Sequence, residues 1–301
     1  MTALALALRD SGKWSATIRS YVAITKPRII LLLLATTVPA MVVAEGGWPS
    51  TALVIATLVG GTASAAGANA INCWYDRDID ALMRRTQSRP LVRGEIPPLN
   101  ALLFGVALGM GAFAFLWATT NLLAAALAAA ALLFYVFIYT VWLKRRSTQN
   151  IVIGGAAGAF PPMVGWAAVT GELAWAPVIM FAIIFFWTPP HFWALALRIA
   201  PDYREAKVPM LPVEVGEVAT RRQILAYSVV LIPITLALLL TGTVGWLYGA
   251  VAGVAGLGFA AIAFGLWRWP KRVPSMRLYT YSLAYLAAIF IVMAIDVGIL
   301  G

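Results

Sequence analysis

The chain has 301 residues, of which 62% are hydrophobic and 11% are charged, and its mean hydropathy is +0.86. This composition excludes a soluble globular domain and is typical of an all-α polytopic membrane protein. The net charge of +10 does not indicate nucleic acid as a partner, because the basic residues are divided among short loops between apolar segments. The single cysteine, Cys73, excludes an intramolecular disulfide and a multi-cysteine metal site.

Residues 1–25 precede the first long apolar segment. The apolar run Ala3–Leu8 is too short for a cleaved signal peptide and is followed by charged residues, so we predict a cytoplasmic or interfacial N-terminal segment. Nine stretches that follow are long enough to cross about 30 Å of hydrocarbon as helices. We expect them within a single domain, 1–301, at approximately 29–48, 51–73, 99–119, 122–143, 149–170, 174–197, 223–243, 245–267 and 278–299.

The basic residues predict the orientation of these helices. All 22 Lys and Arg lie before the first span or after the second, fourth, sixth or eighth, and cytoplasmic loops are enriched in both residues. The opposite loops contain only the acidic residues Glu45 and Glu172, with Asp296 near the C-terminus. We therefore predict that the N-terminus lies inside and the C-terminus outside.

Polar residues gather where the second span ends, in Asn72-Cys-Trp-Tyr-Asp76-Arg-Asp78-Ile-Asp80. On a helix, Asn72, Asp76 and Asp80 share one face at intervals of about 6 Å, whereas Asp78 points roughly the other way. Mg²⁺ typically takes one or two protein carboxylates and completes its shell with water and phosphate oxygens. The spacing therefore suits a magnesium ion that bridges to a bound anion. The alternative is a solvated helix end whose carboxylates only pair with nearby arginines, namely Arg77, Arg84 and Arg85.

Two loops on the basic side, 74–98 and 198–222, are longer than a connection requires, and long loops often carry function. The second contains Pro201-Asp-Tyr-Arg-Glu-Ala-Lys207. Here Asp202, with Glu205 as a further candidate, is a predicted ligand of a second magnesium ion, and Tyr203 a predicted hydrogen-bond partner of a phosphate oxygen. The alternative is a surface linker shaped by three prolines, Pro201, Pro209 and Pro212.

His191 is the only histidine, and it follows Pro189 and Pro190 near the inner end of the sixth span. Three hypotheses remain open for its neutral imidazole. It can bind haem iron, it can contact a substrate in another way, or it can hydrogen-bond a backbone carbonyl that the two prolines leave free.

The order of these motifs resembles that of the UbiA superfamily of intramembrane prenyltransferases. The Asn-x-x-x-Asp-x-x-x-Asp element is similar to the first diphosphate motif of that superfamily. Within it, the chain is most similar to the branch that farnesylates protohaem IX, from Thr25-Lys-Pro27 to Asp296. The motifs that carry this similarity are Asp76–Asp80, Met83–Arg89, Asn150–Gly155 with Pro161-Pro162, Pro190–Trp193 and Asp202-Tyr203.

The resemblance implies nine helices around a central cavity in the bacterial inner membrane, with the active site facing the cytoplasm. It implies farnesyl diphosphate and haem B as substrates, haem O and diphosphate as products, and haem A synthase or oxidase-assembly factors as possible partners. Two Mg²⁺ ions, held by Asn72, Asp76 and Asp80 on one side and by Asp202 on the other, would neutralise the leaving diphosphate. The predicted cationic and substrate contacts are Arg85, Arg89, Lys144, Arg145, Asn150, His191 and Tyr203.

The second loop departs from the superfamily pattern of two aspartates four residues apart, because position 206 is alanine. Two other functions compete with haem farnesylation. Prenyl transfer to a quinone precursor or a chlorin would use the same acidic motif, but the Pro190–Trp193 and Asp202-Tyr203 motifs argue against it. A transporter or haem carrier would place charges along a path at mid-depth, whereas the acidic residues here gather at inner helix ends.

Small residues of the fifth span also allow two interpretations. Glycines let membrane helices approach closely, and they can equally leave room for an isoprenoid tail. The glycines in question are Gly154, Gly155, Gly158 and Gly165.

Overall fold

The structure is a computed structural model that describes residues 3–300, with side chains described for residues 14–297. Within this part of the chain, nine helical spans are long and apolar enough to cross a membrane, which confirms the predicted fold class. The spans are α2 (Pro27–Glu45), α3 (Thr51–Tyr75), α5 (Pro98–Thr119), α6 with η1 (Leu122–Leu133, Phe134–Leu143), α7 with α8 (Asn150–Ala159, Pro161–Thr170), α9 (Trp175–Arg198), α12 with η2 (Gly216–Leu236, Ala237–Thr241), α13 (Trp246–Arg268) and α14 (Ser275–Leu300).

The seventh span differs most from its predicted bounds. It begins at Gly216 rather than near 223, since α12 continues about two turns beyond the apolar segment. Gly216 adopts a left-handed conformation with φ +79°, which suits glycine at a chain turn. The extra turns carry Glu217 and Arg221, which form an ion pair one helical turn apart. A hydropathy window misses such polar turns because it registers only the apolar part of a helix.

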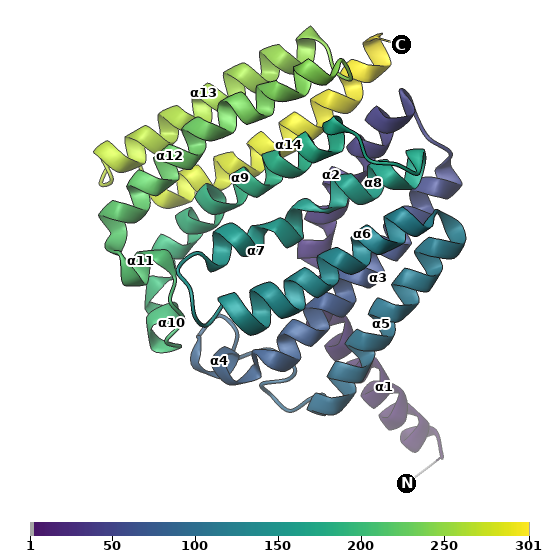
Figure 1. Ribbon diagram of the computed structural model, residues 1–301. Helices are drawn as coiled ribbons and strands as arrows, with labels where there is room; N and C mark the ends of the chain where they lie inside the picture. The colour runs from purple at the N-terminus through teal and green to yellow at the C-terminus, as the bar shows by residue number, and fades with distance from the viewer. Residues whose placement is uncertain (1–2, 301) are drawn as a thin grey trace.

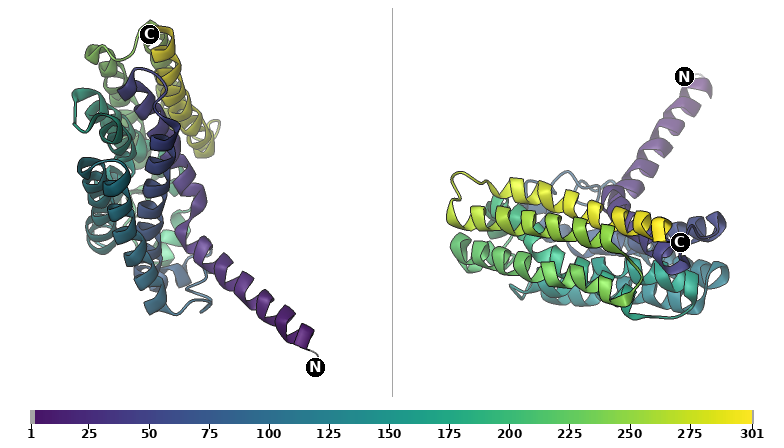
Figure 2. Two further views of the ribbon diagram at one scale, coloured as in Figure 1. Left: turned by 90° about the vertical axis from the view of Figure 1, so that its right-hand side faces the viewer. Right: turned by 90° about the horizontal axis from the view of Figure 1, so that it is seen from above.

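The predicted N-terminal segment is helical, as α1 (Ala3–Thr25), and it extends away from the bundle (Figure 2). Its last turns touch the loop after the second span, where Ser20 Oγ donates to Glu95 Oε2 at 2.6 Å. The ring of Tyr21 also packs edge-on against Phe104, at 5.0 Å between centroids. Lys26 joins α1 to α2 in a left-handed conformation, with φ 56° and ψ 61°.

Short helices organise both long loops. The first loop holds α4 (Arg77–Leu82), and the second holds α10 (Ala200–Glu205) and α11 (Leu211–Glu214). Figure 1 shows α4, α10 and α11 at one end of the bundle and the C-terminus at the other. Buried side chains from both loops form one hydrophobic cluster, in which Ile79 and Met83 join Tyr203 and Met210. The two loops that the sequence singles out therefore meet in space.

Glycines bring several spans close together. A Cβ added to Gly67 would lie 2.7 Å from the Gly105 carbonyl oxygen, so α3 and α5 are in backbone contact. Gly154 and Gly155 likewise lie against the side chains of Tyr139 and Thr188. Gly165 of α8 lies against the backbone of α2. Gly158 differs from these three, because nothing lies within 4 Å of its added Cβ and it lines a cavity.

Candidate active site

The first acidic motif straddles the break between α3 and α4. Asp76 caps α3, yet its amide still donates to the Asn72 carbonyl at 2.9 Å, and the Asp80 amide donates to the Asp76 carbonyl at 2.8 Å. The helical spacing thus continues through the break. Asn72, Asp76 and Asp80 are 2%, 0% and 1% exposed, whereas the Asp78 carboxylate is largely exposed. The motif therefore presents two buried carboxylates and one buried amide to the interior.

This burial rules out a solvated helix end. Among the described residues, neither Asp76 nor Asp80 pairs with Arg77, Arg84 or Arg85. The Arg77 guanidinium instead donates to the Trp74 carbonyl at 2.7 Å. Buried carboxylates are costly unless they are paired or bind a cation, so the partners of these two groups define what the site can hold.

Each of the three buried groups contacts at least one basic side chain, and Asp76 Oδ1 also accepts from the Arg145 guanidinium at 3.4 Å. Lys144 Nζ bonds Asp76 Oδ2, and the Arg89 guanidinium bonds Asp80 Oδ2. Lys26 Nζ donates to Asn72 Oδ1 at 2.7 Å. Burial lowers the pKa of Lys26 from its ordinary value. The sequence predicts Lys144 and Arg89 as site residues but not Lys26, although the Lys-Pro pair directly before the first span was a signal that could have pointed to it.

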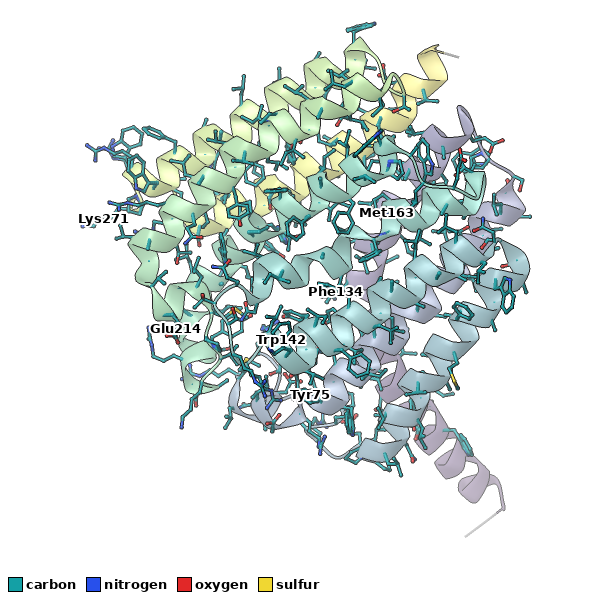
Figure 3. All side chains as sticks on the ribbon, viewed as in Figure 1. Tyr75, Phe134, Trp142, Met163, Glu214 and Lys271 are labelled. Carbon is teal, nitrogen blue, oxygen red and sulfur yellow. The ribbon has the colours of Figure 1, made fainter. Side chains whose placement is uncertain are left out.

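Lys144 owes its position to a π-helical segment. From Phe134 to Leu143 the fourth span is a π-helix, and the Lys144 amide donates to the Tyr139 carbonyl, five residues earlier, at 2.8 Å. Such segments are rare and are frequent at functional sites. In the same segment, Thr140 Oγ1 accepts from Asn72 Nδ2 at 3.0 Å. Figure 3 shows Tyr75, which ends α3, and Trp142, near the end of η1, at the same end of the bundle.

Arg145 clamps this arrangement from outside. Its guanidinium binds both carboxylate oxygens of Asp78, at 2.6 and 2.7 Å, and donates to the Tyr75 carbonyl at 3.1 Å. It also lies 4.8 Å from the centre of the Tyr75 ring. The hydrogen bond to Asp78 raises the pKa of Arg145, and the same bond lowers the pKa of Asp78. Asp78, which lies off the Asn72-Asp76-Asp80 face, therefore anchors Arg145.

Asp80 has a carboxylate oxygen that is available to a metal ion. Its Oδ1 is buried and has no hydrogen-bond partner among the described residues. Burial alone would lower the pKa of Arg89, but the Asp80 carboxylate beside it more than offsets this and the pKa lies above its ordinary value. Thr86 Oγ1 donates to the Asp80 carbonyl at 2.8 Å and so fixes the end of α4.

The donor set fits magnesium that shares its shell with a ligand. The described residues contain no cluster of three or more His, Cys, Asp or Glu side chains that would hold a metal by themselves. Mg²⁺ does not need one, since it binds through one or two carboxylates plus substrate phosphates and water. Two carboxylates and an amide oxygen on one face, with Asp80 Oδ1 unpartnered, suit that mode.

The second loop contributes fewer groups. Asp202 Oδ2 accepts from the Arg85 amide at 3.4 Å, which links α10 to the loop after α4. Tyr203 is 3% exposed, and burial raises the pKa of its hydroxyl, opposed by Arg85. Glu205 is exposed, in contrast to Asp202 and Tyr203. The interpretation of this loop as a plain surface linker is therefore wrong for Asp202 and Tyr203, which meet the first loop.

Arg85 and Asn150 approach the site in different ways. The Arg85 side chain is exposed and, among the described residues, its guanidinium makes no hydrogen bond. Asn150 is 0% exposed and its Nδ2 donates to the Lys144 carbonyl at 3.3 Å, while its Oδ1 has no partner in this part of the chain. Asn150 thus braces the backbone from which Lys144 extends.

His191 lies in an aromatic stack between α9 and α14. Its ring is 4.2 Å from Trp187 and 4.7 Å from Tyr279, nearly parallel to both. Nδ1 lies 2.6 Å from Ser282 Oγ, and Ser282 Oγ donates to the Tyr279 carbonyl at 2.7 Å. Since the serine proton is used there, we assign the Nδ1 proton to the imidazole, which leaves Nε2 as an acceptor. Of the three hypotheses, the bond to a proline-freed carbonyl is not the one formed by Nδ1, whose partner is Ser282.

An apolar cavity of about 160 Å³ lies between the spans. Side chains of α2, α3, α6, α7 and α8 line it, and Gly158 leaves part of its wall open. Asn69 and Tyr135 belong to its lining and lie about one turn along their helices from Asn72 and Thr140. The polar site and the apolar cavity therefore lie one after the other along these helices, an arrangement that suits a molecule with an anionic head and an apolar tail.

Nine membrane-length helices within the described residues, with a buried acidic motif at one end of the bundle, have the architecture of intramembrane prenyltransferases, and solved structures agree with this fold. A digeranylgeranylglyceryl phosphate synthase has a TM-score of 0.78 at 15% identity, over 93% of this chain and 98% of that one. A UbiA homolog from Archaeoglobus fulgidus bound to DMAPP and Mg²⁺ has a TM-score of 0.64 at 18% identity, over 92% and 99%. These similarities concern the fold.

The family model of the UbiA prenyltransferases matches residues 33–293, so the chain belongs to the UbiA prenyltransferase family. Within that family, relatives that share one enzyme name are similar to it over nearly their full length. It is 53% identical to the protoheme IX farnesyltransferase of Gloeobacter violaceus over 98% of this chain and 97% of that protein. It is 55% identical to the enzyme of the same name from Symbiobacterium thermophilum, over 96% and 97%.

Proposed function

We infer that this protein transfers the farnesyl group of farnesyl diphosphate to a vinyl group of haem B, with addition of water, to give haem O and diphosphate. The observation that carries the inference is the buried Asn72-Asp76-Asp80 face with its basic partners, about one helical turn from Asn69, which lines an apolar cavity. The near-full-length similarity to protoheme IX farnesyltransferases supports the choice of acceptor.

In this mechanism the bond between the allylic carbon and the diphosphate oxygen breaks, and its electron pair leaves with the diphosphate. Negative charge grows on that group as the bond stretches, so groups that bind the diphosphate more strongly in the transition state accelerate the step. Lys144 and Arg89, and Arg85 from the loop edge, supply positive charge on the protein side. Arg145 and Asn150 hold Lys144 and its helix end in place.

Magnesium would be held by Asn72, Asp76 and Asp80, and a second ion by Asp202. Bound there, it would neutralise charge on the leaving diphosphate. Tyr203 would donate its hydroxyl proton to a phosphate oxygen, since its raised pKa keeps it protonated. The structure of the UbiA homolog from Archaeoglobus fulgidus, bound to DMAPP and Mg²⁺, supports a metal-assisted reaction here.

The farnesyl chain would occupy the apolar cavity between α2, α3, α6, α7 and α8. The cationic allylic carbon then bonds to the terminal carbon of the haem vinyl group, water adds to the neighbouring carbon, and one proton is released. His191 is the candidate haem contact, since Nε2 has no hydrogen-bond partner among the described residues while Ser282 fixes Nδ1. A neutral imidazole of this kind suits axial ligation of haem iron.

The positions of the basic residues support a site at the cytoplasmic face of a bacterial inner membrane, with the N-terminus inside and the C-terminus outside. Under this topology, a reporter that is active only in the cytoplasm should be inactive when it is fused after Gly301. Lipid surrounds the nine spans, and haem A synthase or oxidase-assembly factors are the partners expected to receive a reactive haem product.

The decisive experiment incubates the purified protein with haem B, farnesyl diphosphate and Mg²⁺ and looks for haem O by mass spectrometry. Parallel reactions offer a quinone precursor or a chlorin as acceptor, and chelator replaces the metal in a third. Haem O formed only with haem B and metal supports the proposal. Product on another acceptor, or haem uptake into vesicles without product, would favour the corresponding alternative.

A further inference from the structure

The three candidate metal ligands are not free, because each already bonds a basic side chain. Lys26 contacts Asn72, Lys144 contacts Asp76, and Arg89 contacts Asp80. Arg145 and Asp78, beside them, compensate each other's charge. Three cations thus face two carboxylates and one neutral amide, which leaves one positive charge in excess at a buried site.

Lys26 is built into this arrangement rather than placed there by a flexible surface chain. Its backbone has φ 56°, a left-handed conformation that residues with a Cβ rarely adopt, and Pro27 restricts it further. The residues before it are fixed to α3, since Asn69 Nδ2 donates to the Thr25 carbonyl at 2.9 Å and Cys73 Sγ contacts the Ile24 carbonyl at 3.7 Å. The junction of α1 and α2 therefore places the Lys26 ammonium group against the Asn72-Asp76-Asp80 face.

We propose that Lys26, Lys144 and Arg89 are exchangeable counter-ions that couple metal binding to diphosphate binding. They hold the ligand oxygens while the site is empty, and they move to phosphate oxygens when metal and diphosphate enter together. The nature of the anion rests on the proposed function, but the exchange itself rests on the three contacts.

The charges explain why exchange produces coupling. A lone divalent cation would meet three basic groups and an excess positive charge, and like charges at short range repel strongly in a buried site. A prenyl diphosphate carries three negative charges, so its complex with one divalent ion is a net anion. The same basic side chains that oppose the metal alone attract that complex, and the two ligands must then assist each other's binding by an equal factor.

Loss of Lys26 should therefore have opposite effects on the two ligands. The metal alone should bind more tightly, because one repelling charge and one competitor for Asn72 Oδ1 are gone. Diphosphate with metal should bind more weakly, because a cation for its oxygens is lost. A lysine that only binds phosphate would leave the binding of metal alone unchanged, and a lysine with a purely structural role would not shift the two affinities in opposite directions.

The test titrates the full chain with Mn²⁺, detected by electron paramagnetic resonance, with and without inorganic pyrophosphate. We expect Lys26→Met to bind Mn²⁺ alone about tenfold more tightly, and pyrophosphate in the presence of Mn²⁺ about tenfold more weakly. Arg28→Met is the matched control, because Arg28 is an exposed basic residue two positions away. It should change neither affinity, and Lys26→Arg should restore both toward wild type.

If Mn²⁺ alone binds Lys26→Met no more tightly than wild type, the exchange is overturned. Should that variant fail to fold, as judged by its thermal melting, Lys144→Met takes its place and must shift both affinities in the same directions. Haem O formation by the same wild-type preparation is measured in parallel. Turnover without coupling would overturn only the exchange, whereas coupling without haem O would overturn the proposed function.

Discussion

The two loops at the charged end of the bundle differ in how completely they are organised. The first supplies two carboxylates, which with the Asn72 amide at the end of α3 are nearly inaccessible and each bonded to a basic side chain. The second supplies Asp202, which is only partly buried and accepts one long hydrogen bond, and Tyr203, which is buried in the hydrophobic cluster with Ile79 and Met83. The carboxylates of the first motif are therefore held by ion pairs, whereas Asp202 forms no ion pair within the described residues.

This difference shows which groups are already in position before a ligand binds. A preorganised group costs no reordering when charge develops beside it, so it contributes more to catalysis than a group that must be drawn into place. Substitutions in the first loop should therefore affect turnover more than equivalent ones in the second.

Replacement of Asp76 or Asp80 by Asn should have the largest effect. We expect kcat to fall by about 10²–10³-fold, since the change removes a charge that binds metal at the leaving group. The measurement is haem O formation by mass spectrometry, with haem binding followed by absorbance to separate chemistry from folding. Asp78→Asn is the matched control on the same short helix, and it should lose less than tenfold because Asp78 is exposed and acts only through Arg145.

Asp202→Asn should have an intermediate effect, a loss of about tenfold in kcat/KM that greater Mg²⁺ concentration partly restores. Its control is Glu205→Gln, which alters an exposed carboxylate three residues away and should leave kcat/KM unchanged. Equal losses in Asp202→Asn and Asp76→Asn would break the comparison, because the second loop would then be as important as the first.

How much of this site the sequence predicts depends on whether a feature lies in one helix or between several. Hydropathy and charge placement predict all nine spans within the described residues, with the seventh beginning too late because its first turns are polar. Helical spacing predicts the shared face of Asn72, Asp76 and Asp80. Both inferences need only the local period of one segment.

Features that arise between helices escape that reasoning. No sequence rule predicts that η1 widens into a π-helix, so the contact of Thr140 with Asn72 is visible only in three dimensions. Lys26 reaches Asn72 across 46 positions of the chain through a left-handed junction. Ser282 reaches His191 across 91 positions, and its small hydroxyl carries no signal in the sequence.

Outside the two loops, His191 allows a test of haem binding. We expect His191→Ala to weaken haem B binding about tenfold and to abolish the Soret shift that accompanies axial ligation. Ser282→Ala should keep ligation but broaden and shift the same band, because Nδ1 loses the acceptor that fixes the ring, and Ser282→Thr should restore it. An unchanged haem spectrum in His191→Ala would exclude axial ligation by this residue.

The smallest expected effect concerns the apolar cavity. Gly158→Leu should raise the KM for farnesyl diphosphate several-fold while changing kcat for the shorter geranyl diphosphate little, because the new side chain fills space that only the longer tail needs. Gly253→Leu is the matched control, since Gly253 of α13 also has nothing within 4 Å of its added Cβ but lies outside the cavity lining. The measurement is steady-state kinetics with both diphosphates, and equal losses with the two chain lengths would mean that the isoprenoid tail lies outside this cavity.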